Sequence, residues 1–226
     1  MNFVESYLRP GDCMIDIGAN IGTYTLLAAS IVGPTGRVDA FEPSPVPAQR
    51  LRDNVARNDL DFVFVHEVAV GDASGAVQFS SDRDGCCNHV IRSAVDGDPD
   101  PGRMSVQSTT LAECCDSQYS FAKVDVEGYE PLILKGASNM LAHRNPPVWQ
   151  LELAGYSNRY GVTTSDLIGF LADSGYVCGV YNATESRLTI TREPWKHGNG
   201  EGNVLAVAVD AFDLLRERVP GIRILQ

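Results

Sequence analysis

The sequence lacks an apolar run long enough to cross a membrane, since Asp, Arg or Gly interrupts its hydrophobic stretches well short of about 20 residues. It begins MNFVESYLRPGD, without the basic start and apolar core of a secretory signal. Basic residues are also few: 18 Lys and Arg stand against 29 Asp and Glu, which gives a formal net charge of −11. Because nucleic acids are bound by basic surfaces, we expect a cytoplasmic protein with neither a nucleic acid nor a membrane as partner.

Two common phosphate-binding signatures and one metal-binding spacing are absent as well. The first predicted strand is followed by neither a G-x-G-x-x-G turn nor a Gly-Lys-Ser/Thr loop, which argues against dinucleotide and nucleoside-triphosphate sites. The six cysteines include two vicinal pairs, Cys86–Cys87 and Cys114–Cys115, but neither pair has C-x-x-C spacing. We therefore expect reduced thiols with a structural or surface role.

What the sequence does contain is the alternation of an α/β protein in 226 residues, enough for one domain with a sizeable core. Apolar periodicity predicts strands at Cys13–Ile17, Arg37–Phe41, Phe62–Val70, Ala76–Phe79, Phe121–Val126, Val148–Leu153, Tyr176–Tyr181, Leu188–Ile190 and Asn203–Val209. Helices are predicted at Thr23–Ile31, from Ser44-Pro45, at Leu132–Leu141 and at Thr164–Ser174. This order predicts a parallel, doubly wound sheet with an antiparallel addition at one edge. The segment Ser81–Arg103, rich in Asp, Gly and Pro, is expected to be a variable loop or insertion within a single domain, 1–226.

The turn after the first strand reads DIGANIG, from Asp16 to Gly22, at the position where open α/β sheets bind their ligands. Gly18 allows a ligand to approach the backbone closely, and Gly22 lets the next helix begin near the strand. Asp16 adds an anion, so a ligand with ammonium and sulfonium groups fits better than a dinucleotide does. Glu42, directly after the second strand, is placed to accept both ribose hydroxyls of an adenosine.

Several stretches of the sequence resemble a known family. Asp16–Gly22 followed by AFEP (Ala40–Pro43) resembles the class I S-adenosylmethionine-dependent methyltransferases. Within them, three stretches resemble the FkbM family: VAVGDASG (68–75), KVDVEGYEPLILKGA (123–137) and WQLEL (149–153). The resemblance implies a Rossmann-like, doubly wound, seven-stranded and mostly parallel sheet with an antiparallel C-terminal hairpin. It also implies methyl transfer from S-adenosylmethionine, usually to a hydroxyl of a sugar, polyketide or other natural product.

The resemblance further implies where the cofactor binds. The expected cofactor-binding residues are Asp16, Gly18, Asn20, Gly22, Glu42 and Asp72. Of these, Asp16, Gly18 and Asn20 would lie near the methionine part. Glu42 would bind the ribose, and Asp72 would lie near the adenine.

Asp125 and Glu127 are the predicted catalytic residues, because transfer to an alcohol needs a base worth about 10²–10⁴-fold in rate. They end the fourth main strand two residues apart, so they point the same way, and two like charges this close would raise at least one pKa. The structural alternative is that Asp125 orders the loop and Glu127 caps the next helix. Together with Glu152 they would also suit Mg²⁺, which is possible but not favoured, so no metal site is predicted. The loop histidines His89 and His197 are the secondary candidates for a base.

The acceptor is expected to bind where two segments follow the strands, Ser81–Arg103 and YSNRY (Tyr156–Tyr160). The first predicted strand begins at Cys13. We therefore expect an open cleft, a cleft closed by Ser81–Arg103, or a cleft completed by a second subunit of a homo-oligomer. The expected partner is a small-molecule or glycan acceptor. Three alternatives stay open: transfer to nitrogen or a carboxylate, a non-catalytic S-adenosylmethionine-binding module, and a nicotinamide-dependent oxidoreductase, which the glycine spacing disfavours.

Overall fold

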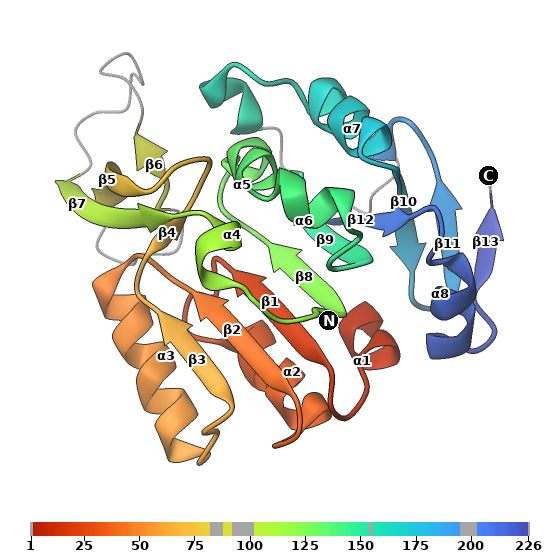
Figure 1. The fold of residues 1–226 in the computed structure, drawn as a ribbon, viewed down its shortest axis with the longest axis horizontal. Coiled ribbons are helices and arrows are strands. Elements are labelled where there is room, and N and C mark those ends of the chain that lie inside the picture. The colour runs from red at the N-terminus through yellow and green to blue at the C-terminus, as the bar shows by residue number, and fades with distance from the viewer. Residues whose placement is uncertain (1, 82–87, 92–101, 154–155, 195–202, 226) are drawn as a thin grey trace.

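The computed structural model describes residues 2–81, 88–91, 102–153, 156–194 and 203–225 (Figure 1). The helices are α1 (Asn2–Tyr7), α2 (Thr23–Val32), α3 (Pro45–Arg57), α4 (Leu111–Cys114), α5 (Glu130–Gly136), α6 (Ser138–Ala142), the 3₁₀ helix η1 (Tyr156–Tyr160), α7 (Thr164–Asp173) and α8 (Phe212–Arg218). No helix in these ranges is both long and apolar enough to cross a membrane.

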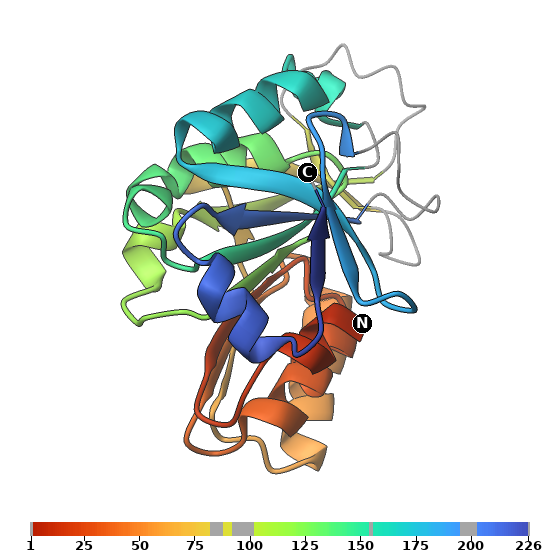
Figure 2. The same cartoon turned by 90° about the vertical axis from the view of Figure 1, so that its right-hand side faces the viewer.

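The described residues form a nine-stranded sheet in the order β13-β11-β10-β12-β9-β8-β1-β2-β3. Its strands are β1 (Cys13–Ile17), β2 (Arg37–Phe41), β3 (Val63–His66), β8 (Phe121–Val124), β9 (Val148–Glu152), β10 (Tyr176–Asn182), β11 (Arg187–Ile190), β12 (Asn203–Ala208) and β13 (Arg223–Leu225). Helices α1–α3, red and orange in Figure 2, lie on one side of it, and the green and cyan helices α5–α7 lie on the other. The doubly wound α/β prediction is therefore confirmed.

Parallel pairing runs from β3 through β2, β1 and β8 to β9. Side chains of β1, β2 and β8 are buried almost throughout, as expected for central strands covered on both faces. At the C-terminal edge β12 pairs antiparallel with β9 and β10, and β10 pairs antiparallel with β11. The prediction of seven strands was too low, because β11 and β13 extend this edge.

A second sheet of four strands was not predicted. It has the order β4-β7-β5-β6, formed by β4 (Ala69–Val70), β5 (Gly75–Ser81), β6 (Val90–Ile91) and β7 (Gly102–Thr109). The single strand expected at Phe62–Val70 is instead two, β3 and β4, which belong to different sheets. The segment Ser81–Arg103 is also more than a loop, since β6 and the start of β7 fall in it, while residues 82–87 and 92–101 lie outside the described residues.

The small sheet packs on the main core through buried apolar side chains. Val70, Phe79, Val90 and Val106 are at most 8% exposed and belong to the same hydrophobic cluster as the central strands. In Figure 1 the small sheet lies beyond the carboxyl ends of β1 and β2. It therefore forms a wall at the edge of the main sheet where ligands of α/β proteins bind.

Candidate active site

A pocket lies at the carboxyl ends of β1, β2 and β8, and residues of the small sheet line part of it. Its lining comprises Ile17, Gly18, Asn20, Phe41, Glu42, Pro43, Ser44, Val68, Ala69, Val70, Phe79, Asn88, Val90, Asp125, Val126, Glu127 and Tyr129. The pocket thus brings together three of the predicted cofactor residues and both predicted catalytic carboxylates. The residues of the small sheet were not predicted, because their place depends on strand pairings that no local pattern shows.

The turn after β1 is fixed by backbone contacts. Gly18 adopts a φ of +76°, and a Cβ atom there would lie 1.9 Å from the carbonyl oxygen of Asp125. The backbone N–H of Gly18 donates to the carbonyl oxygen of Phe41 at 3.0 Å. Asn20 has a φ of +51°, in the left-handed region that Asn adopts more readily than most residues. Glycine and asparagine in this turn are therefore required by its shape.

Glu42 holds this turn from the end of β2. Its Oε2 accepts the backbone N–H of Asn20 at 2.9 Å, and its Oε1 accepts that of Ser44 at 2.8 Å. Burial raises the pKa of Glu42, and the N–H groups of Ser44 and Asn20 act in the opposite direction. The carboxylate is only 6% exposed, yet it lines the pocket, as the sequence predicted.

Asp16 lies beneath the pocket and does not line it. It is fully buried, and its Oδ2 accepts the hydroxyl hydrogen of Thr25 at 2.6 Å, whereas its Oδ1 has no hydrogen-bond partner among the described residues. Burial raises the pKa of Asp16, and the ammonium of Lys123, its register partner on β8, opposes that effect. Gly22 is also outside the lining. Its role is in packing, because a Cβ there would lie 2.5 Å from Leu51 Cδ1 where α2 begins.

The loop after β8 carries both predicted catalytic carboxylates into the pocket. Glu127 has a φ of +57°, an uncommon conformation for a residue with a long side chain. Strained backbone of this kind costs about 1–3 kcal/mol and is concentrated at functional sites. Burial and the charge of Asp125 raise the pKa of Glu127, and Arg159 and His89 lower it.

Two further ionisable residues, Lys123 and Glu152, lie beside Asp125. The Nζ of Lys123, a buried residue, lies 2.8 Å from Asp125 Oδ2. Glu152, at the end of β9, forms a side-chain hydrogen bond with Asp125. Burial alone would raise the pKa of Asp125, but the hydrogen bond from Glu152 and the Lys123 ammonium outweigh it and hold that pKa below its ordinary value.

Among the described residues no side chain caps α5 at Tyr129, so Glu127 does not have the capping role offered as its alternative, and Glu130 instead orders the loop before the helix. The Oε1 atom of Glu130 accepts the backbone N–H groups of Gly128 at 3.2 Å and Val126 at 3.4 Å. Burial raises the pKa of Glu130 to about 7, although these N–H groups lower it. Glu127 is thereby left to line the pocket. The sequence signal that could have singled out Glu130 is its place at the first position of α5, where an acidic residue is favoured by the helix dipole.

The two segments predicted for acceptor binding meet at the pocket. The hydroxyl of Tyr160 in η1 donates to the carbonyl oxygen of Val90 in β6 at 2.7 Å. The Tyr160 ring packs edge-on against Tyr129, with ring centroids 5.0 Å apart, and Tyr129 lines the pocket. His89 is buried beside Val90, where its backbone N–H donates to Ser80 Oγ at 2.8 Å. His197 lies outside the described residues.

Asp72 does not reach the pocket lining. Its Oδ2 pairs with the Nζ of Lys135 on α5 at 3.2 Å. The neighbouring Gly71 lies so close to α5 that a Cβ on Gly136 would be 2.1 Å from the Gly71 carbonyl oxygen. In this structure Asp72 therefore joins the turn after β4 to α5. No group of three or more His, Cys, Asp or Glu side chains in the described ranges is arranged to hold a metal ion.

Comparison with known proteins gives the family. A family model described as the methyltransferase FkbM domain matches residues 16–178. The chain belongs to the FkbM methyltransferase family. The matched span includes Asp16, Glu42, Asp125, Glu127 and Glu152.

Two relatives and one solved structure illustrate the likeness. The chain is 46% identical over 68 residues to the 31-O-demethyl-FK506 methyltransferase FkbM of Streptomyces tacrolimicus. The aligned stretch covers 30% of this chain and 25% of that protein. It is 29% identical over 138 residues to the hexuronic acid methyltransferase AglP of Haloferax volcanii, with coverage of 59% and 53%. The matches thus span a quarter to about half of these relatives. The crystal structure of an FkbM methyltransferase from Methylobacillus flagellatus KT shares the fold, with a TM-score of 0.55 and 18% identity over 91% of this chain and 49% of that one.

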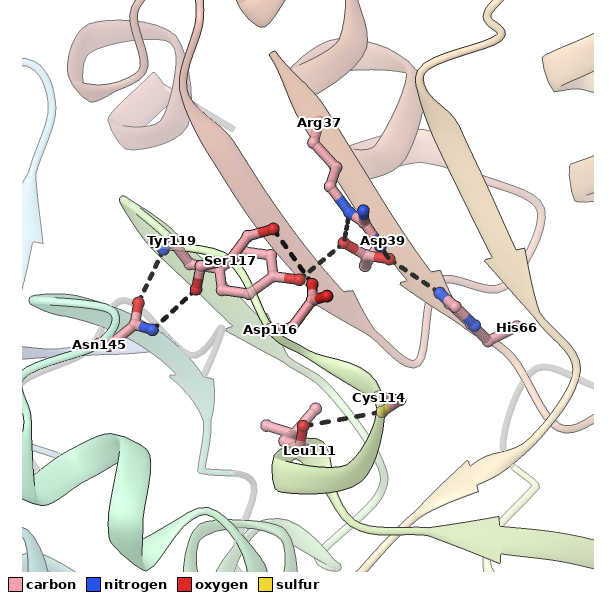
Figure 3. Close-up of polar contacts among 9 residues, drawn as sticks. All are labelled: Arg37, Asp39, His66, Leu111, Cys114, Asp116, Ser117, Tyr119 and Asn145. Atoms are coloured by element: carbon pink, nitrogen blue, oxygen red, sulfur yellow. Dashed lines mark hydrogen bonds and ion pairs between the residues drawn. The ribbon is translucent and has the colours of Figure 1, made fainter.

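Figure 3 shows a polar cluster whose residues do not line the pocket. Asp39 of β2 is fully buried on the sheet face opposite Asp16, because Asp16 is in register with the next residue along β2. Asp39 accepts two hydrogen bonds from Arg37, one from the Tyr119 hydroxyl at 2.8 Å, and contacts His66 Nε2 at 2.9 Å. These contacts outweigh burial and lower the pKa of Asp39.

Cys114 and Cys115 lie in the same region. Both are free thiols, and the Sγ of Cys114 donates to the carbonyl oxygen of Thr110 at 3.2 Å, within the turn of α4. Burial and the Cys114 neighbour raise the pKa of Cys115. The two thiols of this vicinal pair are not joined by a disulfide in the structure. Cys86 and Cys87 lie outside the described residues.

Asp39→Asn is expected to lower the free energy of unfolding by about 1–3 kcal/mol at pH 7, because it removes the charge that Arg37 and His66 contact. The lowered pKa of Asp39 means that its contribution is present above pH 3.8 and is lost as the pH falls below that value. The difference between the two proteins should therefore shrink on acidification, as urea unfolding at pH 7 and pH 3 would measure. The control is Asp213→Asn, on an exposed helix pair, which should change stability little. An equal loss in both variants would contradict a structural role for the Asp39 cluster.

Proposed function

We propose that this chain transfers a methyl group from S-adenosylmethionine to a hydroxyl group of a small-molecule natural product or a sugar. The observation that carries the proposal is a single pocket lined both by Glu42 and by Asp125 and Glu127. A nucleoside cofactor needs an acceptor for its ribose hydroxyls, and a hydroxyl substrate needs a base. The relatives support this acceptor class, since one is named for 31-O-demethyl-FK506 and another for a hexuronic acid.

The residues of the pocket fit the proposed cofactor. The Glu42 carboxylate accepts the backbone N–H groups of Asn20 and Ser44 and also hydrogen-bonds the Ser44 side chain, so at least one of its four acceptor sites remains for a ribose hydroxyl. Val68, Val70 and Phe79 offer apolar surface for the adenine ring, the role that the sequence gave to Asp72. Gly18 and Asn20 are the lining residues of the first turn, where the methionine part would lie, with the charge of Asp16 beneath them.

The bound cofactor supplies an electrophilic methyl group, and the chain supplies alignment and proton removal. Alignment is worth up to about 7–11 kcal/mol when the reacting groups are held in near-attack geometry. The contact between Gly18 and the Asp125 carbonyl fixes the distance between the cofactor turn and the loop that carries the base. Asp125 and Glu127 then stand where a hydroxyl acceptor in the pocket can pass its proton to a carboxylate.

Glu42→Ala is expected to weaken S-adenosylhomocysteine binding by about 1.5–3 kcal/mol, because charge-assisted hydrogen bonds to the ribose are lost. Isothermal titration calorimetry measures this change. Glu42→Gln is the matched variant, since it keeps the side-chain length and one acceptor oxygen and should lose less. Thermal melts without ligand are needed beside the titrations, because Glu42 also accepts the N–H groups of Asn20 and Ser44. Unchanged affinity in a folded Glu42→Ala protein would contradict the ribose role.

The proposed function is tested by parallel titration with S-adenosylmethionine, S-adenosylhomocysteine and NADH, followed by mass-spectrometric detection of methylated products from a panel of sugars and polyketide alcohols. Binding of S-adenosylmethionine and S-adenosylhomocysteine, with no binding of NADH, supports S-adenosylmethionine as the cofactor. A product methylated on oxygen supports the reaction, whereas a product methylated on nitrogen or carboxyl would replace it. NADH binding in place of the other two would overturn the proposal.

A further inference from the structure

Glu152 is a carboxyl group that the proposed reaction does not yet use. It ends β9, and Asp125 directly follows β8. The two strands pair in parallel register, with Val124 opposite Leu151, so Asp125 and Glu152 stand side by side at the next position. Their side chains are hydrogen-bonded to each other. Asp125 lines the pocket and Glu152 does not.

A hydrogen bond between two carboxyl groups requires a proton between them, because ionised carboxylates only accept. The surroundings favour one proton on this pair. Arg159 and His89 lower the pKa of Glu127, whereas Asp16, Asp125 and Glu152 share one buried cation, the ammonium of Lys123. That cation is fixed by the Asp125 oxygen at 2.8 Å and by the Tyr24 ring, whose centroid is 4.6 Å away. One positive charge cannot balance these three carboxylates, which favours a proton on one of them.

We propose that Asp125 and Glu152 act as one proton-holding pair, in which Glu152 is a positioning residue that shares its proton with Asp125. The inference rests on the proposed function and deepens it, since it names the group that takes the hydroxyl proton. When the pair is fully ionised, the acceptor O–H bond breaks and its proton passes to the Asp125 carboxylate. The proton is then shared with Glu152, and the electron pair of the O–H bond stays on the acceptor oxygen.

The electrostatics agree with this arrangement. The hydrogen bond to Asp125, burial, and the charges of Asp125 and Glu127 raise the pKa of Glu152 to about 8, and Lys123 lowers it only in part. The pair therefore holds one proton at neutral pH and loses it as the pH rises through about 8. A base accepts protons only in its ionised form, so the rate of methyl transfer should rise with pH through this range.

The test follows the carboxyl carbons of glutamate by NMR in protein labelled with ¹³C at the glutamate side-chain carboxyl, without cofactor or acceptor. We expect one glutamate to titrate near pH 8, and its signal to vanish in Glu152→Gln. Glu130 is the matched control, because burial raises its pKa to about 7 while its Oε1 accepts backbone N–H groups, those of Val126 and Gly128. Glu130→Gln should remove its own signal and leave that of Glu152 in place. Titration of Glu152 near its ordinary value of 4.5 would overturn the pair.

Asp125→Asn serves if Glu152→Gln does not fold. It keeps the shape of the side chain but removes the charge that shares the proton, so the pKa of Glu152 should fall from about 8 towards 4.5. An unchanged pKa in this variant would also overturn the pair. These titrations need no methyl transfer, so they fail independently of the proposed function. Once an acceptor is known, Glu152→Gln should lose the rise of rate with pH, whereas a purely structural residue would lower stability and leave the pH profile unchanged.

Discussion

Gly18→Ala is expected to destabilise the protein by about 2–5 kcal/mol and to abolish cofactor binding. The added Cβ would lie 1.9 Å from the carbonyl oxygen of Asp125, which no side-chain rotation can relieve. Overpacking costs about 1–3 kcal/mol or more, and the left-handed φ of +76° adds about 1–2 kcal/mol for a residue other than glycine. Urea unfolding gives the first quantity, and calorimetry with S-adenosylhomocysteine gives the second.

Gly161→Ala is the matched control for this prediction. Gly161 has nearly the same φ, +75°, but no atom lies within 4 Å of the position its Cβ would take. It should therefore show the conformational cost alone, about 1–2 kcal/mol. The difference between the two variants measures the overlap with Asp125. Equal losses of stability in the two variants would show that the overlap with the Asp125 carbonyl does not contribute to the destabilisation.

Asp125→Asn is expected to lower kcat by about 10²–10⁴-fold with an acceptor found in the product screen. Its cofactor affinity should change little, because the proposed cofactor contacts come mainly from the ends of β1 and β2. Glu127→Gln is the companion variant, since Glu127 also lines the pocket but has a raised pKa where that of Asp125 is lowered. The measurements are melting temperature, cofactor affinity and rate, each with and without a chelator.

The outcomes separate three roles for these carboxylates. A fall in rate with normal melting and normal cofactor affinity identifies a base. Loss of activity on chelation, restored by Mg²⁺, would identify a metal site instead. Full activity in a folded double variant, Asp125→Asn with Glu127→Gln, would remove both residues from the mechanism and leave His89 and His197 as candidates.

Much of the central fold and of the first turn could be predicted from sequence because the signals are local. Cys13–Ile17 and Arg37–Phe41 were predicted with the bounds the structure gives, since each is a short apolar run closed by turn residues. Glu42 was placed in the pocket by its position after the second strand. One short stretch of sequence determines both where a parallel strand ends and which residue follows it at the ligand-binding edge of the sheet.

The small sheet could not be predicted, because its strands are defined by distant partners. In the run from Val63 to Val70 no glycine or proline marks the point where the chain leaves one sheet and enters the other. β5 pairs antiparallel with β7 across a segment of Asp, Gly and Pro that indicates only a loop. The sequence grouped Asp125 with Glu152 only as possible metal ligands, because their direct pairing depends on the register of β8 against β9.

The order of strands in the main sheet has a consequence for how this protein is made. β1 pairs on one side with β2, which follows it directly, and on the other with β8, which begins at Phe121. During synthesis the turn at Gly18 leaves the ribosome long before the carbonyl of Asp125 that packs against it. Contacts between such distant segments form slowly, because loop-closure entropy must be overcome first. A nascent chain that ends before β8 should therefore be unable to bind cofactor, and binding would report on the completion of folding.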